Sequence, residues 1–167
     1  MASNGATNGA SHDHPRAWST SSTIPLFLDG KEVTTSNTFD VISPVTNQKL
    51  YSCASATEAD AEAAIASCAK AFPAWSKTKP AVRRDIFLRA AEGFAKRKDE
   101  CWKYMREETG SERPMFEFTY AVAIDACKDI AGLIPTIQGT APTVAEEGTS
   151  AVVYREPYGV VLGIAPW

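Results

Sequence analysis

The sequence predicts an α/β protein, and three features of the chain point to that class. Short β-favouring runs separated by turn residues occupy residues 26–54, and stretches with apolar residues three and four positions apart follow over residues 57–134. An unbroken apolar, β-branched run then covers residues 160–165, as in a strand buried on both faces of a parallel sheet. The 167 residues suit one domain or part of a larger one.

The composition is that of a globular chain, with 44% hydrophobic and 22% charged residues. A formal net charge of −3 gives no electrostatic reason to expect nucleic acid or an anionic membrane as a partner, so neither is predicted. Residues 1–22 lack the apolar core of a secretory signal, and we predict a disordered tail on a cytoplasmic protein. The triplet His12-Asp13-His14 lies in this tail, where nothing holds its side chains in place, so no metal site is predicted.

The cysteines Cys53, Cys68, Cys101 and Cys127 form no C-x-x-C pair and have no histidine beside them. We therefore predict reduced thiols rather than a zinc site or a compact disulfide framework. Cys68 and Cys127 fall on apolar helical stripes, where burial suppresses thiol reactivity. None of the four cysteines is predicted to be a catalytic nucleophile.

Two small antiparallel pairs of strands are predicted in the N-terminal part of the chain. Asp29-Gly30 separates the short runs 26–28 and 31–33, and both residues tolerate the positive φ of a tight hairpin turn. A second extended run, residues 38–42, meets the turn-rich segment 43–48 and continues over residues 49–54.

The first two helices are predicted from capping residues and apolar spacing. Thr57 can cap the first helix, with Asp60 three positions on, and its apolar stripe ends at Pro73. Pro80 can open the second helix at its first turn. Its predicted buried face consists of Val82, Ile86, Phe87, Ala90 and Phe94.

Two further helices are predicted, over residues 99–108 and after Pro114. Gly110 stops the first of them, because glycine best adopts the left-handed conformation there. Glu107 and Glu108 point about 100° apart on that helix, so a solvated helix end is a better interpretation than a catalytic carboxylate pair. The last helix has apolar residues alternately four and three apart, which we interpret as a core stripe: Phe116, Tyr120, Ala123, Cys127, Ile130 and Ile134.

Several motifs occur in an order that resembles the aldehyde dehydrogenase superfamily over residues 25–167. They are Leu-Phe-Leu-Asp-Gly-Lys at 26–31, Ser-Pro-Val-Thr at 43–46, Thr-Glu-Ala-Asp-Ala at 57–61, Ala-Phe-Pro-Ala-Trp at 71–75, Glu-Glu-Thr-Gly at 107–110 and the thirteen residues 155–167. The last segment, Arg-Glu-Pro-Tyr-Gly-Val-Val-Leu-Gly-Ile-Ala-Pro-Trp, is the most specific. Within the superfamily the chain is most similar to the branch that handles aromatic aldehydes such as vanillin or salicylaldehyde.

The resemblance implies the N-terminal part of the aldehyde dehydrogenase fold: small β-hairpins, helices flanking an incomplete Rossmann-like sheet, and a β-arm. It implies that residues 23–147 belong to the cofactor-binding domain, residues 148–158 to an oligomerisation arm, and residues 159–167 to the first strand of the sheet. Ligands of such sheets bind beyond the carboxyl ends of the strands. The resemblance therefore makes Ile164, Ala165, Pro166 and Trp167 candidate contacts of NAD or NADP.

The resemblance also limits the activity that we expect. Aldehyde oxidation by this family needs a thiolate nucleophile, an oxyanion donor and a base, and the family's asparagine, glutamate and cysteine for these roles would follow Trp167. No catalytic residue is therefore predicted here, and a truncated portion of the enzyme is expected to be inactive alone. The alternative hypothesis is a non-catalytic protein that docks on a full-length homologue through its arm strand.

Overall fold

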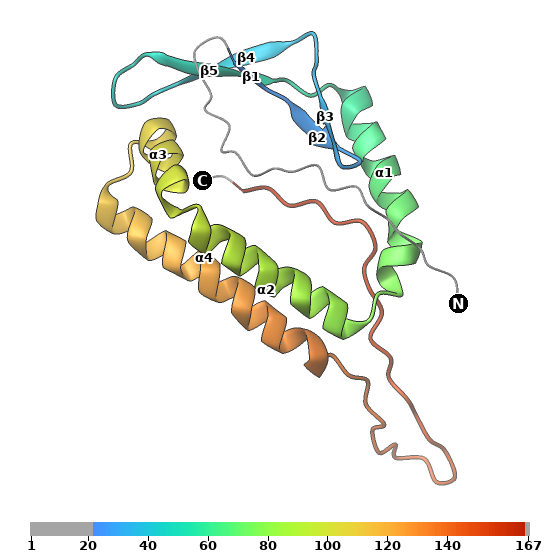
Figure 1. Ribbon diagram of the computed structural model, residues 1–167. Coiled ribbons are helices and arrows are strands. Elements are labelled where there is room, and N and C mark those ends of the chain that lie inside the picture. The colour runs from blue at the N-terminus through green and yellow to red at the C-terminus, as the bar shows by residue number, and fades with distance from the viewer. Residues whose placement is uncertain (1–21, 166–167) are drawn as a thin grey trace, which may run out of the picture.

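The computed structural model describes residues 22–165 and confirms the α/β class (Figure 1). Two small sheets lie at one end, and α2 and α4 run side by side below them. The elements are β1 (Thr23–Ile24), β2 (Leu26–Leu28), β3 (Lys31–Val33), β4 (Thr38–Ile42), β5 (Lys49–Ala54), α1 (Glu58–Ser76), α2 (Pro80–Lys96), α3 (Lys98–Thr109), α4 (Arg113–Leu133) and the short 3₁₀ helix η1 (Ile134–Thr136).

Both predicted antiparallel pairs are confirmed. β2 pairs with β3, and the turn residues Asp29 and Gly30 have φ of 50° and 73°, the positive values that a tight hairpin requires. β4 pairs with β5, and β1 adds to the other edge of β5 in parallel, giving the order β1-β5-β4. The parallel strand β1 was not predicted, because a two-residue strand carries no periodicity of its own.

The capping of α1 is confirmed, but its predicted end is wrong. The Thr57 hydroxyl accepts from the backbone N–H of Asp60, and the Asp60 carboxylate accepts from the backbone N–H of Thr57, a reciprocal capping box. The helix continues through Pro73 to Ser76. Proline lacks an N–H and so removes one bond to the preceding turn, and the Ser76 hydroxyl donates to the Pro73 carbonyl at 3.2 Å to hold the last turn.

As predicted, α2 begins at Pro80, and Gly110, whose φ is 70°, caps α3 after its last residue, Thr109. The buried face predicted for α2 is only partly right. Three of the predicted residues are exposed: Val82, Ile86 and Phe94. The buried residue of α2 is Ala91, which was not predicted. α2 packs mainly on α4, so one flank of its broad apolar surface is covered and the other remains open.

The core lies between α2, α3 and α4. Phe116 is 1% exposed, and its ring lies 5.3 Å from that of Trp102 and 4.9 Å from that of Tyr120. Of the stripe predicted for α4, Phe116, Tyr120 and Ile134 are buried and Cys127 is half-buried, whereas Ala123 and Ile130 are exposed. Ile124 and Ala131 lie on the covered side instead.

Residues 137–165 form no named helix or strand, although Thr140 and Val153 make one antiparallel bridge. A Cβ placed on Gly139 would lie 2.3 Å from the Val153 carbonyl oxygen, so this close approach requires glycine. The bridge closes a long excursion that Figure 1 shows projecting away from the helices. Residues 160–165 run extended, without pairing to any strand of the described chain.

Candidate functional site

The candidate cofactor contacts lie at the end of the extended run. Ile164 is 83% exposed and Ala165 is exposed as well, so both present apolar side chains to the surroundings. Pro166 and Trp167 lie outside the described residues. The structure therefore places only part of the predicted set.

The start of the same run lies against α1. Gly159, Val160 and Val161 line an apolar cavity of about 240 Å³ together with four residues of α1: Cys68, Ala71, Phe72 and Trp75. This contact positions the run that leads to Ile164. The cavity lining is hydrocarbon, aromatic ring and one thiol, so it suits apolar atoms rather than a charged phosphate.

The four cysteines are all unpaired, but their environments differ. Cys68 is exposed, contrary to its predicted burial, and it is one of the residues that line this cavity. Cys53 is half-buried, and burial followed by the nearby Glu108 charge raises its pKa. A raised pKa keeps that thiol protonated at neutral pH, which is the opposite of what a nucleophile requires.

A polar contact joins the small sheet to the helical layer. Tyr51 of β5 is buried, and its hydroxyl donates to Oε1 of Glu108 at the end of α3. Burial, and then the Glu108 carboxylate, raise the pKa of Tyr51 far above its usual range. The prediction of a purely solvated end for α3 is therefore incomplete, because Glu108 has a buried donor from a strand far away in sequence.

A second polar cluster lies across β4 and β5. The Ser52 hydroxyl donates to Oδ1 of Asp40 at 2.8 Å, and Lys49 Nζ lies 2.7 Å from the same oxygen. Lys49 and then Ser52 lower the pKa of Asp40 by stabilising its charged form. Asp40 is thus an ionised carboxylate paired with Lys49, and a lowered pKa makes it a poor general base.

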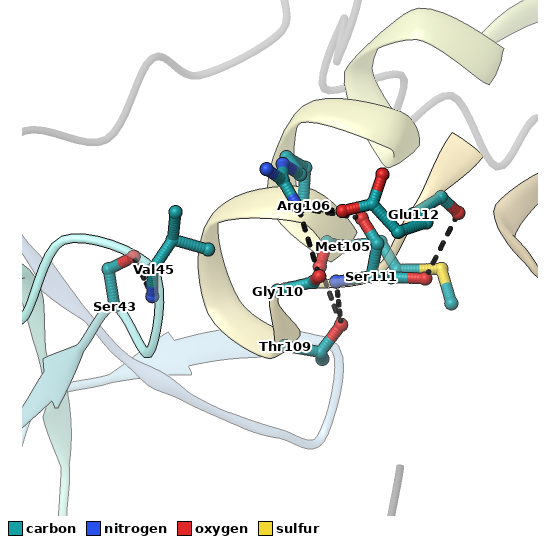
Figure 2. Close-up of polar contacts among 8 residues, drawn as sticks. All are labelled: Ser43, Val45, Met105, Arg106, Thr109, Gly110, Ser111 and Glu112. Carbon is teal, nitrogen blue, oxygen red and sulfur yellow. Dashed lines mark hydrogen bonds and ion pairs between the residues drawn. The ribbon is translucent and has the colours of Figure 1, made fainter.

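The turn between α3 and α4 is held by Arg106, as Figure 2 shows. Its Nη1 donates to the Gly110 carbonyl at 2.9 Å, to the Ser111 carbonyl at 3.3 Å and to Glu112 Oε1 at 3.0 Å. The Thr109 hydroxyl donates to the Met105 carbonyl at 2.6 Å and accepts from the backbone N–H of Ser111 at 3.3 Å. These bonds tie the residues after α3 to its last turn, so the cluster organises the turn and occupies Nη1 of Arg106.

Between residues 22 and 165, no group of three or more His, Cys, Asp or Glu side chains is arranged to hold a metal ion. The triplet His12-Asp13-His14 lies outside that range. Of the helices in the described part of the chain, none combines the length and apolar character needed to cross a bilayer.

Solved structures share this arrangement of hairpins and helices. A salicylaldehyde dehydrogenase from Pseudomonas putida G7, complexed with salicylaldehyde, matches with a TM-score of 0.76 and 24% identity over 81% of this chain and 28% of that chain. An NAD-dependent benzaldehyde dehydrogenase from Corynebacterium glutamicum matches with a TM-score of 0.73 and 24% identity over 78% of this chain and 29% of that chain. The chain thus has the fold of part of an aldehyde dehydrogenase.

Sequence comparison identifies the family. The model described as "Aldehyde dehydrogenase family" matches residues 32–167, and the chain belongs to that family. A vanillin dehydrogenase from Pseudomonas sp. (strain HR199 / DSM 7063) is 36% identical over 146 residues, which is 86% of this chain and 30% of that protein. A salicylaldehyde dehydrogenase from Pseudomonas putida is 30% identical over 145 residues, 85% of this chain and 30% of that protein. The chain therefore spans about 30% of the length of these curated relatives.

Proposed function

We propose that this chain forms the N-terminal part of an NAD(P)-dependent aldehyde dehydrogenase that oxidises an aromatic aldehyde to its carboxylate. The observation that carries the proposal is the family match over residues 32–167. The aromatic substrate class is supported by relatives whose names refer to vanillin and salicylaldehyde. A cytoplasmic location is part of the same proposal, and the unpaired cysteines support it.

We assign cofactor contact to Ile164, Ala165, Pro166 and Trp167, at the end of the proposed first strand in residues 159–167. Two observations support this role for the described pair: both side chains are exposed, and the run that carries them is positioned against α1. Apolar side chains and backbone groups fit the contact that a strand end makes with a dinucleotide. The nicotinamide, when bound, supplies the hydride acceptor, and these residues supply position.

We further propose that the 167-residue chain alone does not turn over aldehyde. The reaction needs a thiolate and a base placed to activate water. The raised pKa of Cys53 and the lowered pKa of the ion-paired Asp40 do not meet these requirements. Residues 23–147 would then serve as part of the cofactor-binding domain and residues 148–158 as the arm through which the complete enzyme forms a homo-oligomer.

A second candidate is a non-catalytic assembly protein that docks on a full-length homologue through its arm. The bridge between Thr140 and Val153 supports it, because Val152 and Tyr154 on either side of the bridge are exposed beside an open backbone edge. An open edge can accept an added strand from a partner.

A chimera tests the main proposal. Residues 32–167 replace the matched region of the Pseudomonas vanillin dehydrogenase, and reduced cofactor is measured with vanillin and salicylaldehyde in the presence of NAD⁺ or NADP⁺. We expect aldehyde-dependent reduction by the chimera and none by the 167-residue chain. The matched variants are Val161→Asp, which places a charge in the cavity lining, and Tyr158→Phe, at a fully open position. The first should abolish activity of the chimera and the second should retain it.

Two outcomes would contradict the proposal. Turnover by the homogeneous 167-residue chain would show that it carries its own reacting groups. A chimera that folds and binds NAD⁺ but oxidises only aliphatic aldehydes would reject the aromatic substrate class. A pull-down with full-length vanillin dehydrogenase decides the second candidate: capture that is lost in Tyr154→Pro supports arm docking, and no capture rejects it.

A further inference from the structure

We draw no further inference here: the strongest candidate, the apolar cavity of about 240 Å³ between α1 and residues 159–161, carries nothing because the chain spans about 30% of the length of its curated relatives and nothing in the structure shows what fills this cavity.

Discussion

Replacing Tyr51 and Glu108 tests the contact that joins the small sheet to α3. Tyr51 is 2% exposed, whereas the Glu108 side chain is open to solvent. Tyr51→Phe removes a hydrogen bond to a charged acceptor, worth about 1.5–3 kcal/mol, but the Glu108 carboxylate regains water. Glu108→Ala instead leaves a buried hydroxyl without its acceptor, which costs about 1–3 kcal/mol and is not offset by hydration. We expect losses in the free energy of unfolding of about 1 kcal/mol for Tyr51→Phe and about 2 kcal/mol for Glu108→Ala.

Urea unfolding followed by tryptophan fluorescence measures these losses, at one fixed protein concentration because association shifts apparent stability. The double variant should lose no more than Glu108→Ala alone, which corresponds to a coupling free energy of about 1 kcal/mol. Glu107→Ala is the matched control, since the adjacent carboxylate points elsewhere on the helix, and it should change stability by less than about 0.5 kcal/mol. Strictly additive losses, or an equal loss in Glu107→Ala, would refute the assigned contact.

Three further outcomes are expected. Burial, and then the hydrogen bond with Cys101, raise the pKa of Tyr120 from 10.0 to about 12. The neutral hydroxyl of Tyr120 therefore contributes fully to the free energy of unfolding below pH 10, and this contribution is lost as the pH rises toward 12. Urea unfolding between pH 10 and pH 12 should therefore show a shallower decline of the free energy of unfolding in Tyr120→Phe than in the parent chain. An unchanged slope would reject the raised pKa of Tyr120. Gly139→Ala should abolish amide-exchange protection at Val153, because the added Cβ would overlap the Val153 carbonyl oxygen. Gly132→Ala is the control and should leave that protection unchanged, since a Cβ at Gly132 meets no other atom. Retained protection in Gly139→Ala would contradict the close approach of Gly139 to Val153. Thr57→Ala should destabilise α1 by about 1 kcal/mol, measured by urea unfolding followed by circular dichroism of the helices. An unchanged stability would argue against the capping box.

Local features of the fold could be predicted from the sequence because their causes are local. Asp29 and Gly30 are residues that tolerate positive φ, so the β2–β3 hairpin follows from the turn itself. Thr57 and Asp60 satisfy each other across one helical turn, and no distant residue is needed. The parallel addition of β1 to β5 could not be predicted in this way, because it depends on two segments that meet only in the folded chain.

The stripe of α4 shows why core positions were predicted only in part. Ala123 and Ile130 lie on one flank of Phe116, and Ile124 and Ala131 lie on the other. Both sets satisfy helical spacing and both are apolar, so periodicity alone cannot select between them. The position of α2 decides which flank is covered, and that is a tertiary contact. The same reasoning applies to the site, where the partnership of Tyr51 with Glu108 joins residues 57 positions apart.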